Sequence, residues 1–248
     1  MHACGLAVAI LLLGGPVLAS TPFGGDDTGF IPPDQGVFVC ASKTQLLAAK
    51  LVVADTKCHI RLAAAGLDGN SEEGCTKAAR AKFDHATGSV LGTGCPLCVV
   101  QNVNFTPIAK TIEEQLDAAN GDVFCAGTTL LGDDDTGFVP PTTAAYRCEA
   151  SVAKGLAALR YCLAKCHAKY AKSVMRGTPI DEEACESTDP LLSCRAKFDR
   201  VRDRVAGICP SCLDANAQNG LADGIEMDFD QTNDTFYCES PSGAFVER

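Results

Sequence analysis

The chain contains an internal duplication, and this duplication constrains its fold more than any other feature. The run Asp-Asp-Thr-Gly-Phe-Ile-Pro-Pro at residues 26–33 returns at residues 134–141 with Val in place of Ile. A series of cysteines follows each run in the same order. Because the two copies are expected to share a scaffold, residues kept in both indicate that scaffold, and residues that change together are expected to lie in contact.

Residues 1–19 have the character of a secretory signal. An apolar run from Leu6 to Leu13 is followed by small residues up to Ala19, where we expect cleavage. The run is shorter than the roughly 20 residues of a membrane helix, and Lys or Asp interrupts the later apolar stretches, so we expect no membrane span. We predict a signal peptide at 1–19, copy one at 20–129 and copy two at 130–248, in a protein that is secreted, periplasmic or held at the cell surface.

Cleavage would remove Cys4 and leave an even number of cysteines in each copy. An even count in an exported chain indicates disulfides, and we expect them to close within each copy. The cysteines of copy one are Cys40, Cys58, Cys75, Cys95, Cys98 and Cys125, and those of copy two are Cys148, Cys162, Cys166, Cys185, Cys194, Cys209, Cys212 and Cys238.

Two cysteines of copy two have no equivalent in copy one. Cys162 aligns with Ala54 and Cys194 aligns with Ala79. A pair that is gained together is most simply one bond, so we predict Cys162–Cys194. Antiparallel helices then predict two further pairs, Cys166–Cys185 and Cys58–Cys75.

The remaining cysteines include one Cys-Pro-x-Cys motif in each copy. We expect each cysteine of a motif to bond one end of its own copy, with the choice of partner left open. The sets are Cys95 and Cys98 with Cys40 and Cys125, and Cys209 and Cys212 with Cys148 and Cys238. The alternative is a thiol–disulfide oxidoreductase, which needs a strand before the motif and a helix that starts at it. Neither is expected here, so we favour a structural role.

Apolar residues spaced by three and four predict a mainly all-α fold. In each copy we expect a disulfide-stapled helical hairpin, then a third helix, with extended termini at 20–34 and 127–143. The first helix of copy one is expected to open at Ser42, and the second helices at Ser71 and Asp181. Third helices are expected over 106–119 and 221–231, ended by Asn120 and Asn233 in left-handed conformation.

Metal and cofactor motifs do not emerge clearly from the sequence. Cys162-x-x-x-Cys166-His167 has the wrong spacing for haem, and His59 and His167 are interpreted as polar residues beside the helix stripe. Residues 228–239 match part of a calcium loop but lack its glycine, and the acids at 26–27 and 133–135 are interpreted as turn residues. The sequence therefore predicts no cofactor, no metal ligand and no catalytic residue.

The composition argues against several classes of binding partner. A net charge of −10 and the absence of tryptophan argue against nucleic acid, anionic membranes and stacked sugars.

The order Asp-Asp-Thr-Gly-Phe-x-Pro-Pro, Lys-Cys-His, Glu-Glu-x-Cys, Ala-Lys-Phe-Asp, Cys-Pro-x-Cys resembles tandem cysteine-rich repeats of uncharacterised bacterial secreted proteins. That resemblance implies export and fold, with no activity. We expect a non-enzymatic binding or surface module with an unknown extracellular partner; a small apolar-ligand carrier is a further alternative.

Overall fold

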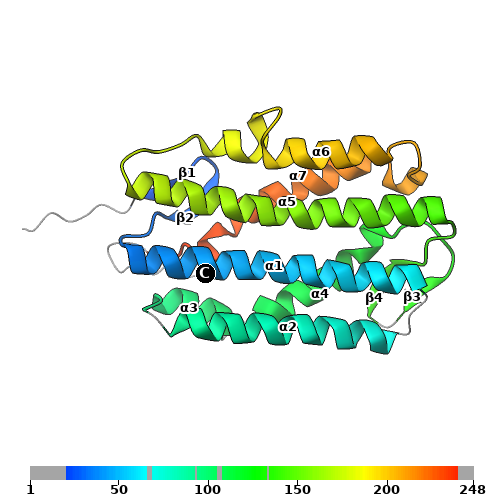
Figure 1. Cartoon of the computed structure of the whole chain (residues 1–248), viewed down its shortest axis with the longest axis horizontal. Helices are drawn as coiled ribbons and strands as arrows, with labels where there is room; N and C mark the ends of the chain where they lie inside the picture. Colours follow the sequence, from blue (N-terminus) through cyan, green and yellow to red (C-terminus); the bar gives the residue numbers. More distant parts are fainter. Residues whose placement is uncertain (1–20, 66–68, 93, 105–107, 133, 240–248) are drawn as a thin grey trace, which may run out of the picture.

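The computed structural model describes residues 21–65, 69–92, 94–104, 108–132 and 134–239. The predicted signal at 1–19 lies outside them. The fold is mainly α-helical, as expected (Figure 1). Copy one forms β1 (Pro22–Gly24), β2 (Asp27–Phe30), α1 (Gln35–Ala65), α2 (Gly69–Leu91), α3 (Leu97–Asn104) and α4 (Ile108–Val123). Copy two forms β3 (Leu130–Gly132), β4 (Asp135–Phe138), α5 (Thr143–Met175), a π-helical turn η1 (Ala184–Thr188), α6 (Cys194–Val205), a 3₁₀ turn η2 (Ser211–Leu213), α7 (Ala215–Gln231) and η3 (Asn233–Thr235).

The long helices α1 and α5 run side by side through the middle of the protein, with α2 packed on α1 and α6 packed on α5 (Figure 1). Both apolar clusters contain residues of both copies: Ala157 and Ala171 of α5 join one with Leu51, and Ile60 and Leu62 of α1 join the other. The two copies therefore bury their apolar faces against each other.

Helix α1 is also long and apolar enough, by composition, to cross a membrane. Residues 35–64 contain a window with a mean hydropathy of 1.5, because charged residues interrupt it less than the sequence pattern suggested. However, 61% of that window is buried inside the protein. Helices at the core of water-soluble proteins share this character.

Two short antiparallel hairpins replace the extended termini that we predicted. In the first, Pro22 pairs with Phe30, and in the second Leu130 pairs with Phe138. The hairpins lie at opposite ends of the helical layer (Figure 1). Both copies therefore build the same local structure from the repeated Asp-Asp-Thr-Gly-Phe run.

The two hairpins dock on equivalent surfaces that lie at very different distances along the chain. The β3–β4 hairpin packs on α4, which directly precedes it, and the Thr136 hydroxyl donates to the Asp117 carbonyl over 2.9 Å. The β1–β2 hairpin packs instead on α7 and η3 near the other end of the chain, where the Thr28 hydroxyl donates to the Asp230 carbonyl over 3.0 Å. Copy two is thus completed by the first hairpin of copy one.

The structure contains all three disulfides that the comparison of copies predicts: Cys58–Cys75, Cys162–Cys194 and Cys166–Cys185. Cys40–Cys95 and Cys148–Cys209 also close within their copies. The expectation that every bond closes within a copy is wrong, because Cys98 bonds Cys238 and Cys125 bonds Cys212. The last cysteine of each copy reaches the other copy because the hairpin exchange brings those chain ends together.

Several predicted helix ends also differ. Helix α1 begins at Gln35, where the Asp34 carboxylate accepts from the Gly36 and Val37 amides, while the Ser42 hydroxyl donates to the Phe38 carbonyl inside the helix. Helix α3 was not predicted. Asn120 lies within α4 and Asn233 opens η3, so neither ends its helix as a left-handed cap. Both side chains have tertiary partners instead, which periodicity cannot show.

We predict that Gly29→Ala destabilises the protein by about 1–3 kcal/mol. Gly29 has φ +99°, and a Cβ there would lie 2.7 Å from the Tyr237 carbonyl oxygen. Gly220→Ala is the control: this exposed glycine lies inside α7 with open space around it, so alanine should stabilise by up to about 1 kcal/mol. Urea unfolding measures both, and equal effects would contradict the docking of the first hairpin.

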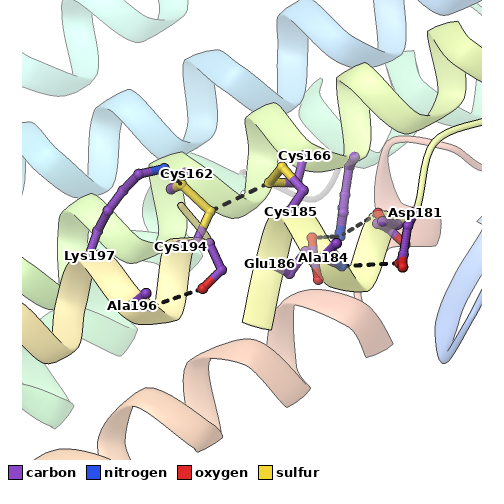
Figure 2. The surroundings of a disulfide bond; sticks show 12 residues. Cys162, Cys166, Asp181, Ala184, Cys185, Glu186, Cys194, Ala196 and Lys197 are labelled. Carbon is purple, nitrogen blue, oxygen red and sulfur yellow. Dashed lines mark hydrogen bonds and ion pairs between the residues drawn. A yellow bond between two sulfur atoms is a disulfide. The ribbon is translucent and has the colours of Figure 1, made fainter. Parts of the chain in front are cut away.

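A second prediction concerns the Cys162–Cys194 bond, which lies beside Cys166–Cys185 between α5 and the η1–α6 segment (Figure 2). The double variant Cys162→Ala plus Cys194→Ala should keep the fold and lose about 2–4 kcal/mol of unfolding free energy. Copy one already carries alanine at both aligned positions. Cys162→Ala alone should release one titratable thiol, and a thiol assay that finds none would contradict the pairing.

Candidate metal centres

His59 of α1 lies in the interior, among carboxylates from three other elements. Its Nε2 atom is 3.2 Å from a carboxylate oxygen of Glu72 in α2, 3.1 Å from Asp117 in α4 and 3.7 Å from Asp135 in β4. All four residues are buried. We call this set centre one.

His167 of α5 occupies the equivalent place in copy two. Its Nε2 atom is 3.1 Å from Asp27 in β2, 3.0 Å from Glu186 and 3.7 Å from Glu182. Asp230 of α7 is 3.9 Å away. The His167 side chain is 0% exposed, and the others are nearly as inaccessible. We call these five residues centre two.

The duplication accounts for the likeness of the centres, and the hairpin exchange completes both. The histidines belong to the repeated Lys-Cys-His, the glutamates Glu72 and Glu182 to the repeated Glu-Glu-x-Cys, and the hairpin aspartates to the repeated Asp-Asp-Thr-Gly. Asp117 and Asp230 each precede an asparagine by three positions and the last cysteine of their copy by eight. Each centre therefore draws residues from both copies.

Several atoms that meet in these centres lack a well-aligned hydrogen bond, although short contacts join them to one another. Within the described chain, Nε2 of both histidines and several carboxylate oxygens are buried without an aligned hydrogen bond; the oxygens belong to Asp27, Glu72, Glu182, Glu186 and Asp230. Buried polar atoms normally have partners, so each such atom requires an explanation. A cation among these atoms would satisfy them together.

Sets of three donor atoms within 4.8 Å of one another are close enough to share a small cation. They are His59, Glu72 and Asp135 in centre one, and in centre two Asp27, His167 and Glu182 or His167, Glu186 and Asp230. Donor atoms about 2.1 Å from a common ion lie about 3.0–3.4 Å apart in octahedral or tetrahedral arrangements. The closest contacts of Nε2 are 3.1 and 3.2 Å in centre one, and 3.0 and 3.1 Å in centre two. These four contacts match ligand-to-ligand distances, whereas Asp135 and Glu182 lie 3.7 Å and Asp230 3.9 Å from Nε2 of their histidine.

The second ring nitrogen of His167, Nδ1, contacts the side chain of Asn233 on the side of the ring away from the carboxylates. Asn233 donates through Nδ2 to the Thr28 carbonyl, which leaves its Oδ1 to face Nδ1 of His167 at 2.9 Å. Because Oδ1 only accepts, this contact favours a proton on Nδ1, although Nε2 of Gln45 also lies 3.2 Å from Nδ1. A neutral ring with its proton on Nδ1 would face the carboxylates with the lone pair of Nε2. Metal-bound histidines are typically held in this way. Gln45 donates to the same Oδ1 over 3.0 Å.

The equivalent asparagine of copy one contacts a carboxylate instead of an imidazole. Asn120 donates through Nδ2 to Oδ1 of Asp135 over 3.0 Å. Both asparagines thus hold a hairpin against a centre, one through the imidazole and a backbone carbonyl, the other through the carboxylate itself.

Electrostatics oppose keeping these carboxylates ionised side by side. Burial raises the pKa of Glu182 to about 10 and the pKa of Asp230 to about 8, with neighbouring carboxylates acting in the same direction. Burial likewise raises the pKa of Asp135 to about 7. Burial alone would lower the histidine pKa values, but nearby carboxylates outweigh it and raise the pKa of both His59 and His167 to about 10. The carboxylates of each cluster thus favour a positive charge at the imidazole, which the histidine would carry in the absence of a metal ion.

The sequence interpretation missed both centres. His59 and His167 are buried in the interior rather than placed beside the apolar face of their helices. Asp27 and Asp135 are more than turn residues, because the hairpins that carry them place their carboxylates beside these histidines. Within residues 228–239, Asp228 contacts Arg160 whereas Asp230 joins centre two, so these two acids do not share a calcium loop. The sequence feature that could have revealed the centres is that both copies keep a histidine and acidic residues at aligned positions.

Neither Cys-Pro-x-Cys motif forms a bond within itself. Cys95 bonds Cys40, and Cys98 bonds Cys238 in the other copy. In copy two, Cys209 and Cys212 likewise bond residues outside their motif. The motifs fasten α3 and the η2 segment to distant parts of the chain.

Comparison of this chain with protein-family models, with curated proteins and with solved structures finds no match.

Proposed function

We propose that the chain is an exported, non-enzymatic metal-binding protein that holds one divalent transition-metal ion in each of its two centres. One observation carries the proposal: in both copies, an imidazole nitrogen and carboxylate oxygens converge at 3.0–3.2 Å in the interior without aligned hydrogen bonds. A cation would supply the missing partner and balance the charge.

The donor set indicates the class of ion. Calcium and magnesium prefer oxygen ligands alone, whereas each centre includes an imidazole. A mixture of imidazole and carboxylate suits zinc, manganese or iron in the divalent state. We therefore expect Zn²⁺, Mn²⁺ or Fe²⁺ rather than Ca²⁺.

Burial of the centres favours holding an ion over catalysis. Catalytic metal sites keep a coordination position open to substrate. His59 is 3% exposed and His167 is 0% exposed, and side chains surround both Nε2 atoms. A bound ion would be enclosed, as expected for a structural or stored metal.

The disulfides support an oxidising location. All cysteines of the described chain, from Cys40 to Cys238, are paired in seven bonds. Such density is typical of exported proteins. It also weakens the oxidoreductase alternative, because a dithiol motif that cycles between thiol and disulfide would have to bond within itself.

Metal-stripped protein with intact disulfides should bind two ions of Zn²⁺ or Mn²⁺ per chain in equilibrium dialysis followed by elemental analysis. His59→Ala and His167→Ala should each reduce the stoichiometry to about one. His85→Ala is the matched control, because this histidine is exposed on α2, and it should retain two ions. Retention of two ions per chain by both buried-histidine variants would contradict the proposal.

A cavity favours the apolar-ligand carrier as a second candidate function. It has a volume of about 730 Å³ and lies between α1, α3, α4 and α7. Its walls are mostly apolar, and Arg160, Asp228 and Gln45 supply polar groups. Cavities of this size and character accept small organic ligands.

The apolar anionic dye 1-anilinonaphthalene-8-sulfonate should bind this cavity and gain fluorescence. Ala49, which lines the cavity and is 3% exposed, offers a way to fill it: Ala49→Leu should weaken dye binding at least fivefold. Ala215→Leu, at the exposed first residue of α7, should leave binding unchanged. Equal dye affinity in the two variants would remove the carrier function.

A further inference from the structure

The two centres differ in the number of groups that face the histidine. In centre one, three carboxylates lie within 4 Å of Nε2 of His59 in the described chain. In centre two, four carboxylates lie within that distance of Nε2 of His167. The additional group is Glu186, which follows Cys185 directly, and copy one has Thr76 at the aligned position.

Local helix geometry directs these two side chains differently. Thr76 lies on the regular helix α2, and its hydroxyl donates to the Glu73 carbonyl over 3.2 Å, so it is engaged by its own helix. Glu186 lies in the π-helical turn η1, and its carboxylate reaches to 3.0 Å from His167. Single π-helical turns occur frequently at functional sites.

The two centres differ in how many carboxylates contact the histidine, and not in whether further acidic residues lie nearby. Copy one has Asp55 one helical turn before His59, where copy two has Leu163. Asp55 is 2% exposed and interacts with His59 through its charge. It is not among the carboxylates that contact Nε2 in the described residues. Asp55 is therefore a nearby acid that does not contact the imidazole, whereas all four carboxylates of centre two lie within 4 Å of Nε2 of His167.

Donor number bears on which ion a centre accepts. One imidazole and three carboxylates supply four ligands, the number that zinc takes in tetrahedral sites. Centre two offers two sets of donors that share Nε2 of His167, one with Asp27 and Glu182 and one with Glu186 and Asp230. Together they would supply five ligands to one ion. Carboxylate-rich sites with higher coordination suit manganese.

We propose that the centres have diverged in selectivity: centre one is a four-coordinate zinc site, and Glu186 makes centre two relatively more favourable for Mn²⁺. This inference rests on the proposed metal-binding function. Zinc generally binds nitrogen and oxygen sites more tightly than manganese, so the prediction concerns a ratio. The Kd for Mn²⁺ divided by the Kd for Zn²⁺ should be at least tenfold smaller at centre two.

Single-centre proteins make the ratio measurable. His167→Ala leaves centre one and His59→Ala leaves centre two, each in the full chain with its disulfides intact. Competition dialysis with Zn²⁺ and Mn²⁺ gives the ratio for each. Adding Glu186→Thr to the His59→Ala protein should raise its ratio toward that of centre one. Adding Thr76→Glu to the His167→Ala protein should lower its ratio, and because this change adds a donor, the result cannot arise from simple loss of binding.

The possible results separate the inference from the proposed function. Equal ratios in the two single-centre proteins, or ratios that neither exchange of residues moves, would overturn divergent selectivity while leaving a two-site metal-binding protein. Failure of both single-centre proteins and of the unmodified chain to retain either metal would overturn both.

Discussion

The meeting of carboxylates around a buried imidazole is the interaction on which the architecture depends. Each centre brings together a long helix, a second helical segment, a third helix and a hairpin. Like charges at this distance repel, and removing them from water is costly. The surrounding frame must therefore hold them in place. The disulfides Cys58–Cys75 and Cys166–Cys185, adjacent to His59 and His167, fasten each histidine helix to the segment that carries Glu72 or Glu186.

The sequence predicts the local part of this structure well. Aligned alanines in copy one and cysteines in copy two were enough to pair Cys162 with Cys194, because both lie on facing helix stripes. Helical spacing gave the fold class. The hairpins were predicted only as extended segments, since a Gly such as Gly29 signals a turn or a close approach but does not say which surface the turn will meet.

The centres could not be predicted because each is completed by a hairpin of the other copy, and the residues of centre two come from opposite ends of the chain. Asp27 meets Asp230 only after the first hairpin crosses to copy two, and nothing near either residue encodes that crossing. The assumption that each copy closes on itself also misdirected the pairing of Cys98 and Cys125. The sequence does show that both copies keep a histidine, a glutamate and two aspartates at aligned positions, although much of the remaining sequence differs.

The exchanged bonds Cys98–Cys238 and Cys125–Cys212 are equivalent under the duplication, since each joins the second cysteine of a Cys-Pro-x-Cys motif to the final cysteine of the opposite copy. A chain with only one copy could make this pair of bonds, and insert its hairpin in this way, only with a second molecule. It would be a covalent, strand-exchanged homodimer with two identical centres. Fusion of two copies into one polypeptide makes the same assembly independent of concentration and frees each half to change without the other.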